Sequence, residues 1–175
     1  MTSRVSSHLL YCEPDRILRQ MVVERDNQQT ITAIFSLNDS LVESSHTSFF
    51  DGILSSAIVS LKKQMTVLEL AEIRKSYNYV DFSVGNLIIS AIEPKKMLID
   101  FGTEETAEIN RILQSHSDLP GFPLIDFITA AVYYPALILG FNAVLELNKQ
   151  AELILWENTD LVGLRLKSDT HIHNI

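Results

Sequence analysis

The segment Glu152-Leu153-Ile154-Leu155-Trp156 brings a strand pattern back late in this 175-residue sequence, after a middle region with helical patterns. Two further strands are predicted after it, at 161–166 and 170–175. Residues 1–60 also have strand character, with polar segments between three apolar-rich runs, at 17–23, 30–37 and 49–54. We therefore predict an α+β fold in which both ends of the chain pair in one sheet system, with the termini close together.

Local signals add detail at the N-terminal end. The polar segment 24–29 predicts a hairpin turn between the first two strands, and 38–48 is predicted to be a loop. Gly52 predicts a bend in the third strand.

The middle of the sequence alternates between helix and strand signals. Thr66 and Glu69 fit a capping box, which predicts a helix over 66–77. Strands are predicted at 80–92 and 97–101, and a helix after Thr103 with one face formed by Ile109, Ile112, Leu113 and His116. Pro123 begins a buried apolar helix over 123–132, and Pro135 is expected to break it before a short turn that ends at Gly140.

Composition excludes several classes of protein. Fourteen Lys and Arg against 22 Asp and Glu give a net charge of −8, so we expect no nucleic-acid partner and no anionic membrane partner. One cysteine excludes an internal disulfide framework and a four-cysteine zinc site. No apolar run reaches the ~18 residues of a membrane span, and the first residues do not form a signal peptide, so we expect a cytoplasmic protein.

Two separated motifs carry a resemblance to a known family. Residues 134–141 and 145–156 read YPALILGF and LELNKQAELILW, and 51–59 read DGILSSAIV. They resemble the patterns N-P-A-x-x-L-G, G-x-L-E-P-G-K-x-A-D-L-V-L-W and N-G-I-L-V-P-G-F-V of the amidohydrolase superfamily, in its cytosine deaminase-like and chlorohydrolase-like branch. Residues 4–8 and 157–161 are most similar to the aminodeoxyfutalosine deaminase-like members.

The resemblance implies a composite β-sandwich made from residues 1–60 and 140–175. Residues 61–139 would then be a short α/β insert in place of the family's TIM barrel, because an eight-stranded barrel takes ~200 residues. The family holds its catalytic metal with an H-x-H pair, two further histidines and an aspartate. Here Lys62-Lys63-Gln64 stands at the H-x-H position, and a protonated lysine has no lone pair for a metal. We therefore predict a non-catalytic protein without a cofactor.

Few residues remain as candidates for chemistry. Glu104 occupies the place of the family's metal-binding aspartate, and Asp100 is a possible acid-base partner, but we expect Glu104 to stabilise a helix start. Asp100, Glu104, Glu105 and Glu108 are expected to form a solvated acidic face rather than a cation site. His171 and His173 would share one side of a strand and so could bind a metal, but we expect them to be incidental. Cys12, beside Glu13, is not expected to be a nucleophile.

These observations favour a binding, scaffolding or regulatory role, with a homo-oligomer or a protein partner covering the apolar helix 123–132. One alternative is a metal-dependent hydrolase or deaminase acting on C–N bonds. Its site would be rebuilt from Glu104, His116 or the two C-terminal histidines, or would be completed by another chain. A further alternative is a small-molecule sensor with a pocket near Tyr133 and Tyr134 for a purine or related heterocycle, although aromatic core is the commoner role of such residues.

Overall fold

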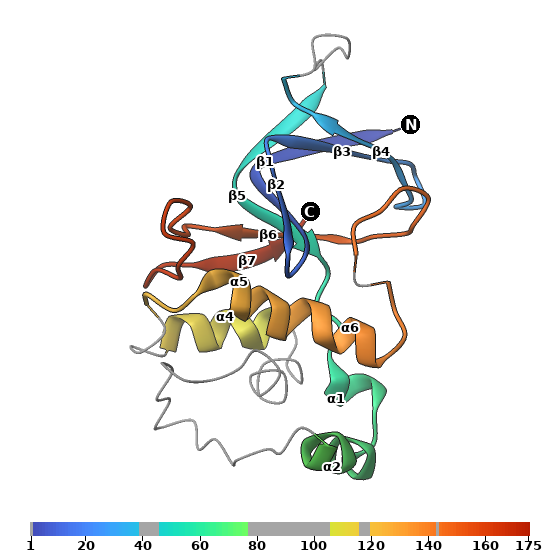
Figure 1. The fold of residues 1–175 in the computed structure, drawn as a ribbon, viewed down its shortest axis with the longest axis vertical. Coiled ribbons are helices and arrows are strands. Elements are labelled where there is room, and N and C mark those ends of the chain that lie inside the picture. The colour runs from blue at the N-terminus through green and yellow to red at the C-terminus, as the bar shows by residue number, and fades with distance from the viewer. Residues whose placement is uncertain (1, 39–45, 77–105, 116–119, 143) are drawn as a thin grey trace.

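Strand β5 (Thr47–Ser56) lies between strands from the two ends of the chain, β1 (Ser3–Glu13) and β6 (Leu153–Glu157). The computed structural model describes residues 2–38, 46–76, 106–115, 120–142 and 144–175 (Figure 1). The other strands are β2 (Arg16–Arg19), β3 (Met21–Arg25), β4 (Ile31–Ser36) and β7 (His171–Asn174). The helices are α1 (Leu61–Gln64), α2 (Val67–Ser76), α4 (Thr106–Ser115), α5 (Leu124–Ile128), the π-helical η2 (Thr129–Tyr133) and α6 (Tyr134–Ile138).

The strands form one mixed sheet in the order β4-β3-β1-β5-β6-β7, with β2 paired to β1. Strands β1 and β5 are parallel, whereas the other neighbouring strands are antiparallel. The prediction that both ends of the chain pair in one sheet system is therefore confirmed. Arg25 contacts residues from both ends of the chain. It pairs with Ser3 across the sheet and donates a hydrogen bond to the main-chain oxygen of Ile175 at 3.3 Å.

A β-bulge lies in the middle of β5. The register between β1 and β5 shifts after Ser7, so that His8 stands opposite both Asp51 and Gly52. Gly52 has a φ of 150°, and a Cβ atom there would lie 2.1 Å from the main-chain oxygen of Trp156. Only glycine allows this close approach of two main chains. Past the bulge, β1 and β5 continue from the upper strands β3 and β4 toward the lower pair β6 and β7 (Figure 1).

Side chains on the two faces of these strands enter two separate cores. The inner core is enclosed by the curved sheet and consists of Val5, Leu10, Cys12, Val23, Ile31, Leu54, Leu145, Ala151, Leu153 and Leu155. The helix-facing core joins the sheet to the helices. Its strand residues are Leu9, Tyr11, Ile53, Ile154, Trp156 and Ile172, and its other residues include Ile109, Leu113, Phe122, Leu124, Phe127, Ile128 and Val132. Adjacent residues such as Leu155 and Trp156 therefore serve different cores, as the alternation of a strand requires.

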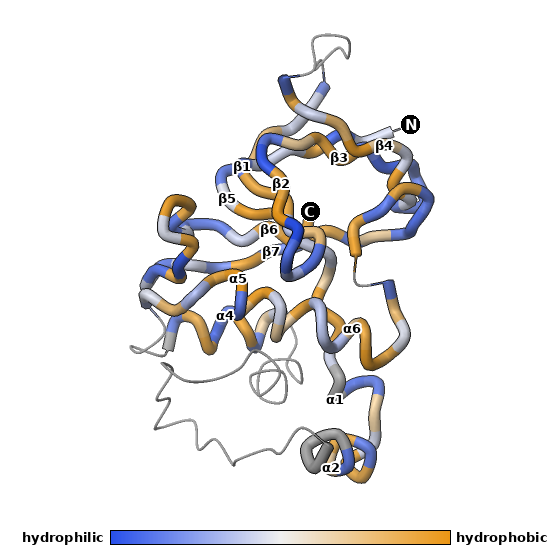
Figure 2. Tube along the Cα trace, viewed as in Figure 1, coloured by the Kyte–Doolittle hydropathy of each residue, from blue (hydrophilic) through white to orange (hydrophobic). Residues whose placement is uncertain are grey.

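The helical run from α5 to α6 covers the lower part of the sheet. Figure 2 shows that much of this run is hydrophobic. Pro135 was expected to break this run, but that prediction is wrong, because helix continues from Leu124 to Ile138. The π-helical turn η2 ends at Tyr133, two residues before Pro135, and accommodates a residue that has no N–H to donate. Gly140, with a φ of 71°, ends α6 as predicted, and Phe141 donates its N–H to the carbonyl of Ala136 at 2.8 Å.

Several local predictions are confirmed. A hairpin joins β3 and β4 through the predicted polar turn, where Asp26 Oδ1 accepts hydrogen bonds from the N–H groups of Gln28 and Thr30. Helix α2 follows the predicted capping box, because Glu69 accepts a hydrogen bond from the Thr66 N–H at 2.7 Å and donates its own N–H to Thr66 Oγ1 at 3.3 Å.

Two strand predictions are wrong. The run 17–23 is two strands, β2 and β3, which Gln20 separates with a φ of 51°. The run 161–166 is a set of turns, because Asp160 Oδ1 accepts the N–H groups of Val162 and Gly163 and bends the chain. The predicted strands at 80–92 and 97–101 lie outside the described residues.

Candidate functional site

Helix α1 carries Lys62, Lys63 and Gln64, which stand where the family resemblance predicts the H-x-H pair. An open groove borders this helix, and its lining residues are Ile58, Val59, Ser60, Lys63, Gln64, Thr106, Ala107 and Asn174. Among these lining residues there is no histidine, cysteine, aspartate or glutamate. The described lining of the groove therefore does not provide the donor atoms that bind zinc or iron in proteins.

The acidic candidates are only partly described. Asp100, Glu104 and Glu105 fall outside the described residues, as does His116, so the structure does not place them. Glu108 lies in the first turn of α4, where its carboxylate accepts hydrogen bonds from the guanidinium of Arg111. This pair is three residues apart on one helix surface, which is an ordinary arrangement for a solvated ion pair.

The two C-terminal histidines lie on β7, opposite the end of β6. The ladder pairs Glu157 with His171 and Leu155 with His173, so Glu157 and both histidines point to the same face. His171 Nε2 is 3.0 Å from Glu157 Oε2, and His173 Nδ1 is 3.6 Å from the same oxygen. The two rings stack with centroids 6.2 Å apart, and His171 Nδ1 is 3.2 Å from the main-chain oxygen of Asp169.

Glu157 is the member of this group that sequence reasoning missed. It is the last residue of β6, one position beyond the predicted strand 152–156. Both strands were predicted, and an antiparallel pairing of them brings the end of the first beside the start of the second. The missing information was the register, which sequence alone does not set for strands joined by a long connection.

One of the two tyrosines at the end of the helical run packs against the core. Tyr133 packs against the helix-facing core, and its ring meets that of Tyr134 at 70° with centroids 5.6 Å apart. Tyr11 is completely buried beneath this run, and its hydroxyl lies 2.8 Å from Thr129 Oγ1. Burial raises the pKa of Tyr11, so its hydroxyl stays protonated at neutral pH.

Cys12 is buried in the inner core, where burial raises the pKa of its thiol. The positive charge of Arg16 acts in the opposite direction and lowers the pKa of the thiol. Burial is the larger effect, and the thiol therefore lacks the thiolate character and the access of a catalytic nucleophile.

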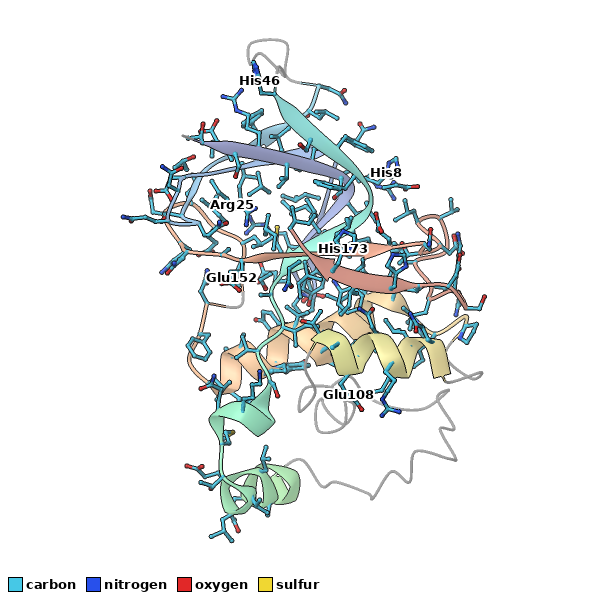
Figure 3. All side chains as sticks on the ribbon, turned by 180° about the vertical axis from the view of Figure 1, so that it is seen from behind. His8, Arg25, His46, Glu108, Glu152 and His173 are labelled. Atoms are coloured by element: carbon cyan, nitrogen blue, oxygen red, sulfur yellow. The ribbon has the colours of Figure 1, made fainter. Side chains whose placement is uncertain are left out.

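Arg25 is a buried cation between the upper strands and the segment that carries Glu152 (Figure 3). It donates to the main-chain oxygens of Ala151 and Ile175, each at 3.3 Å. Burial lowers its pKa, and the charge of Glu152 opposes this effect. Its contacts join β3 to two C-terminal segments, which is a structural role.

Comparison with protein-family models and with curated proteins finds no match to this chain. The resemblance to amidohydrolases therefore rests on the two sequence motifs. In the described part of the chain, no helix is both long enough and apolar enough to cross a membrane.

Proposed function

We propose that this protein is a non-catalytic relative of the amidohydrolases that acts by binding, as a scaffold or a regulator. In this proposal, residues 1–60 and 140–175 form the composite domain of that superfamily, and residues 61–139 replace its barrel. The strand order supports the proposal, because β5, which carries the DGILSS motif, is flanked by β1 and by β6 with its ELILW motif.

The observation that carries the non-catalytic part is the lining of the groove beside α1. Metal-dependent hydrolysis needs an ion that lowers the pKa of a bound water, and ligands that hold this ion. The described lining offers Lys63 and Gln64 on α1 and Thr106 and Asn174 from other elements. An ammonium repels a divalent cation, and neutral amides and hydroxyls are weak ligands for zinc or iron.

The proposal includes assembly, either with a second copy of the chain or with a protein partner. Several large apolar side chains are exposed in the described residues: Phe49, Val67, Leu68, Leu137, Phe141, Leu147 and Val162. Leu137 lies in α6 and Phe141 lies three residues after its end, and they are 57% and 50% exposed. Light scattering is expected to give a mass above that of one 19.8 kDa chain. A monomer would overturn homo-assembly and leave the protein partner.

Activity assays test the non-catalytic part. Protein supplemented with zinc, iron or manganese is incubated with amino-substituted purines and pyrimidines, and ammonia release is measured. We expect no release above that of buffer with the same metal. Turnover that depends on the metal and on the protein concentration would overturn the proposal.

The second candidate is a metal-dependent hydrolase or deaminase with a rebuilt site. The convergence of Glu157, His171 and His173 favours it, because two imidazoles and a carboxylate also hold zinc in some hydrolases. It predicts that turnover disappears in His171→Gln, whereas a binding protein has no turnover to lose.

A further inference from the structure

We propose that Glu157, His171 and His173 form a binding site for one Zn²⁺ ion at the β6–β7 edge of the sheet. This site is separate from the groove at α1 where the family resemblance places a metal, and it does not depend on the proposed function. Two of its residues come from one four-residue strand and the third from the strand beside it.

The distances fit a tetrahedral ion. Four ligands at about 2.0–2.1 Å from zinc lie about 3.3–3.4 Å from one another. The distances from the histidine nitrogens to Glu157 Oε2, 3.0 Å for His171 and 3.6 Å for His173, fall on either side of that spacing. All three donor atoms lie within 4.8 Å of one another.

The contacts of His171 leave one of its ring nitrogens facing Glu157. The main-chain oxygen of Asp169 can only accept, so the Nδ1 atom of His171 carries the proton of that 3.2 Å contact. In a neutral ring the Nε2 atom then has a lone pair, which faces the carboxylate oxygen of Glu157 at 3.0 Å. Two lone pairs at this distance repel unless a proton or a metal ion lies between them. Zinc ligands of this type commonly have their second ring nitrogen held by a carbonyl.

The main chain that carries the histidines is fixed on both sides. Ladder hydrogen bonds to β6 hold one side of β7. On the other side, the amide of Asn110 on α4 brackets Ile172, donating to its carbonyl at 2.6 Å and accepting from its N–H at 2.7 Å. Thr170, which precedes the site, is buried and donates to the carbonyl of Asn158 at 3.0 Å. The donor atoms are therefore presented by an ordered strand.

The donor set and its exposure favour zinc over other ions. Magnesium and calcium prefer sites made of oxygen ligands alone, whereas two imidazoles with one carboxylate suit zinc. The three side chains are between 30% and 44% exposed, which leaves room for water as the fourth ligand.

The experiment uses the full chain, purified without affinity histidines and freed of metal with a chelator. Zinc chloride alone is titrated by calorimetry into the wild type and into His171→Gln, His173→Gln and Glu157→Gln. The matched control is His8→Gln, because His8 is also an exposed histidine paired with a carboxylate, Asp51, at 3.2 Å, but it has no second histidine in a described cluster. Circular dichroism shows whether each variant is folded.

We expect one zinc ion per chain in the wild type and in His8→Gln, with binding at least about tenfold weaker in each folded variant of the cluster. Nitrogen chemical shifts of the histidine rings give a second measurement, in which the Nε2 signal of His171 moves on zinc addition. A wild type that binds no zinc, or cluster variants that bind as well as His8→Gln, would overturn the proposal. A His171 ring that stays protonated on both nitrogens in excess zinc would also overturn it, because the contact with Glu157 would then be an ion pair.

Discussion

The inner core and the helix-facing core are built on opposite faces of the same strands, yet they use different parts of the chain. The inner core is made of strands together with Leu145 and Ala151 from the segment before β6. The helix-facing core also needs α4, α5 and η2, which come from the middle of the sequence. Neighbouring residues on one strand therefore pack in different cores. This difference means that single substitutions can separate the stability of the sheet from the docking of the helices.

The largest expected effect comes from Gly52→Val, because the bulge at Gly52 serves both cores. A side chain there would collide with the main-chain oxygen of Trp156, and the φ of 150° disfavours a branched residue. We expect a loss of about 5 kcal/mol or more, which unfolds a marginally stable domain.

Gly140→Val is the control, since Gly140 also has a positive φ but a side chain there meets open space. It should cost only about 1–2 kcal/mol. Urea unfolding followed by circular dichroism measures both variants. Equal losses would show that the close approach at Gly52 is not what fixes the bend.

The next largest losses of stability are expected from alanine substitutions at two neighbouring residues of β6, which test the two cores separately. Trp156 meets Phe127 edge to face with centroids 5.9 Å apart, whereas Leu155 points into the inner core. Trp156→Ala should cost about 3–5 kcal/mol and Leu155→Ala about 2–5 kcal/mol. Combined with Phe127→Ala, the Trp156 variant should deviate from additivity by about 0.5–3 kcal/mol, and the Leu155 variant by less than about 0.5 kcal/mol. Strong coupling between Leu155 and Phe127 would contradict the division into two cores.

A smaller effect concerns the hydrogen bond that joins sheet and helix in the helix-facing core. Tyr11→Phe removes the hydroxyl beside Thr129 and should cost about 1–2 kcal/mol, because Thr129 is left buried without this partner. The double variant with Thr129→Val should recover part of that loss.

The same tyrosine gives a dependence on pH. Burial raises the pKa of Tyr11 in the folded state above its ordinary value of about 10, so ionisation favours the unfolded chain. Stability from this group is complete below about pH 10 and falls as the pH rises above that value. Unfolding free energies between about pH 8 and 11 should fall less in Tyr11→Phe than in the wild type. Identical slopes would contradict the assignment to Tyr11.

The smallest effect is expected at α2, because its described side chains, at 67–72, belong to neither core. Val67 and Leu68 are 83% and 79% exposed. Thr66→Ala removes the capping interaction with Glu69 and should fray the first turn of α2. The unfolding free energy of the whole chain should change by less than about 0.5 kcal/mol. A larger change, measured by urea unfolding, would show that α2 is coupled to one of the cores.

Much of this architecture was accessible from the sequence where a pattern is local. The capping box at Thr66, the hairpin turn at Asp26 and the helix end at Gly140 each have a short-range physical cause, and each is found in the structure. Strand β1 is not among the predicted runs, and the buried positions of its first half include serines. Ser6 and Ser7 are buried, and they satisfy their hydroxyls with the main-chain oxygens of Met21 and Leu9.

The errors arise where a long-range contact or a side-chain turn decides the outcome. Apolar residues at 161–166 favour a strand, but Asp160 Oδ1 accepts main-chain N–H groups there and stabilises a turn instead. Pro135 ends many helices, but here the apolar residues of η2 pack in the core, and Pro135 and Ala136 of α6 are also buried. The convergence of Glu157 with His171 depends on strand register, and local patterns do not contain it.

The position of β5 between β1 and β6 has a consequence for how the protein is made. Residues 57–152 separate the end of β5 from the start of β6. At the usual speed of synthesis, about 5–20 residues per second, about 5–20 s pass between the synthesis of Ile53 and Leu54 and the synthesis of their partners in β6. During that interval the nascent chain exposes an apolar strand edge, and a chaperone that binds such edges would meet this protein before its own C-terminal strands do.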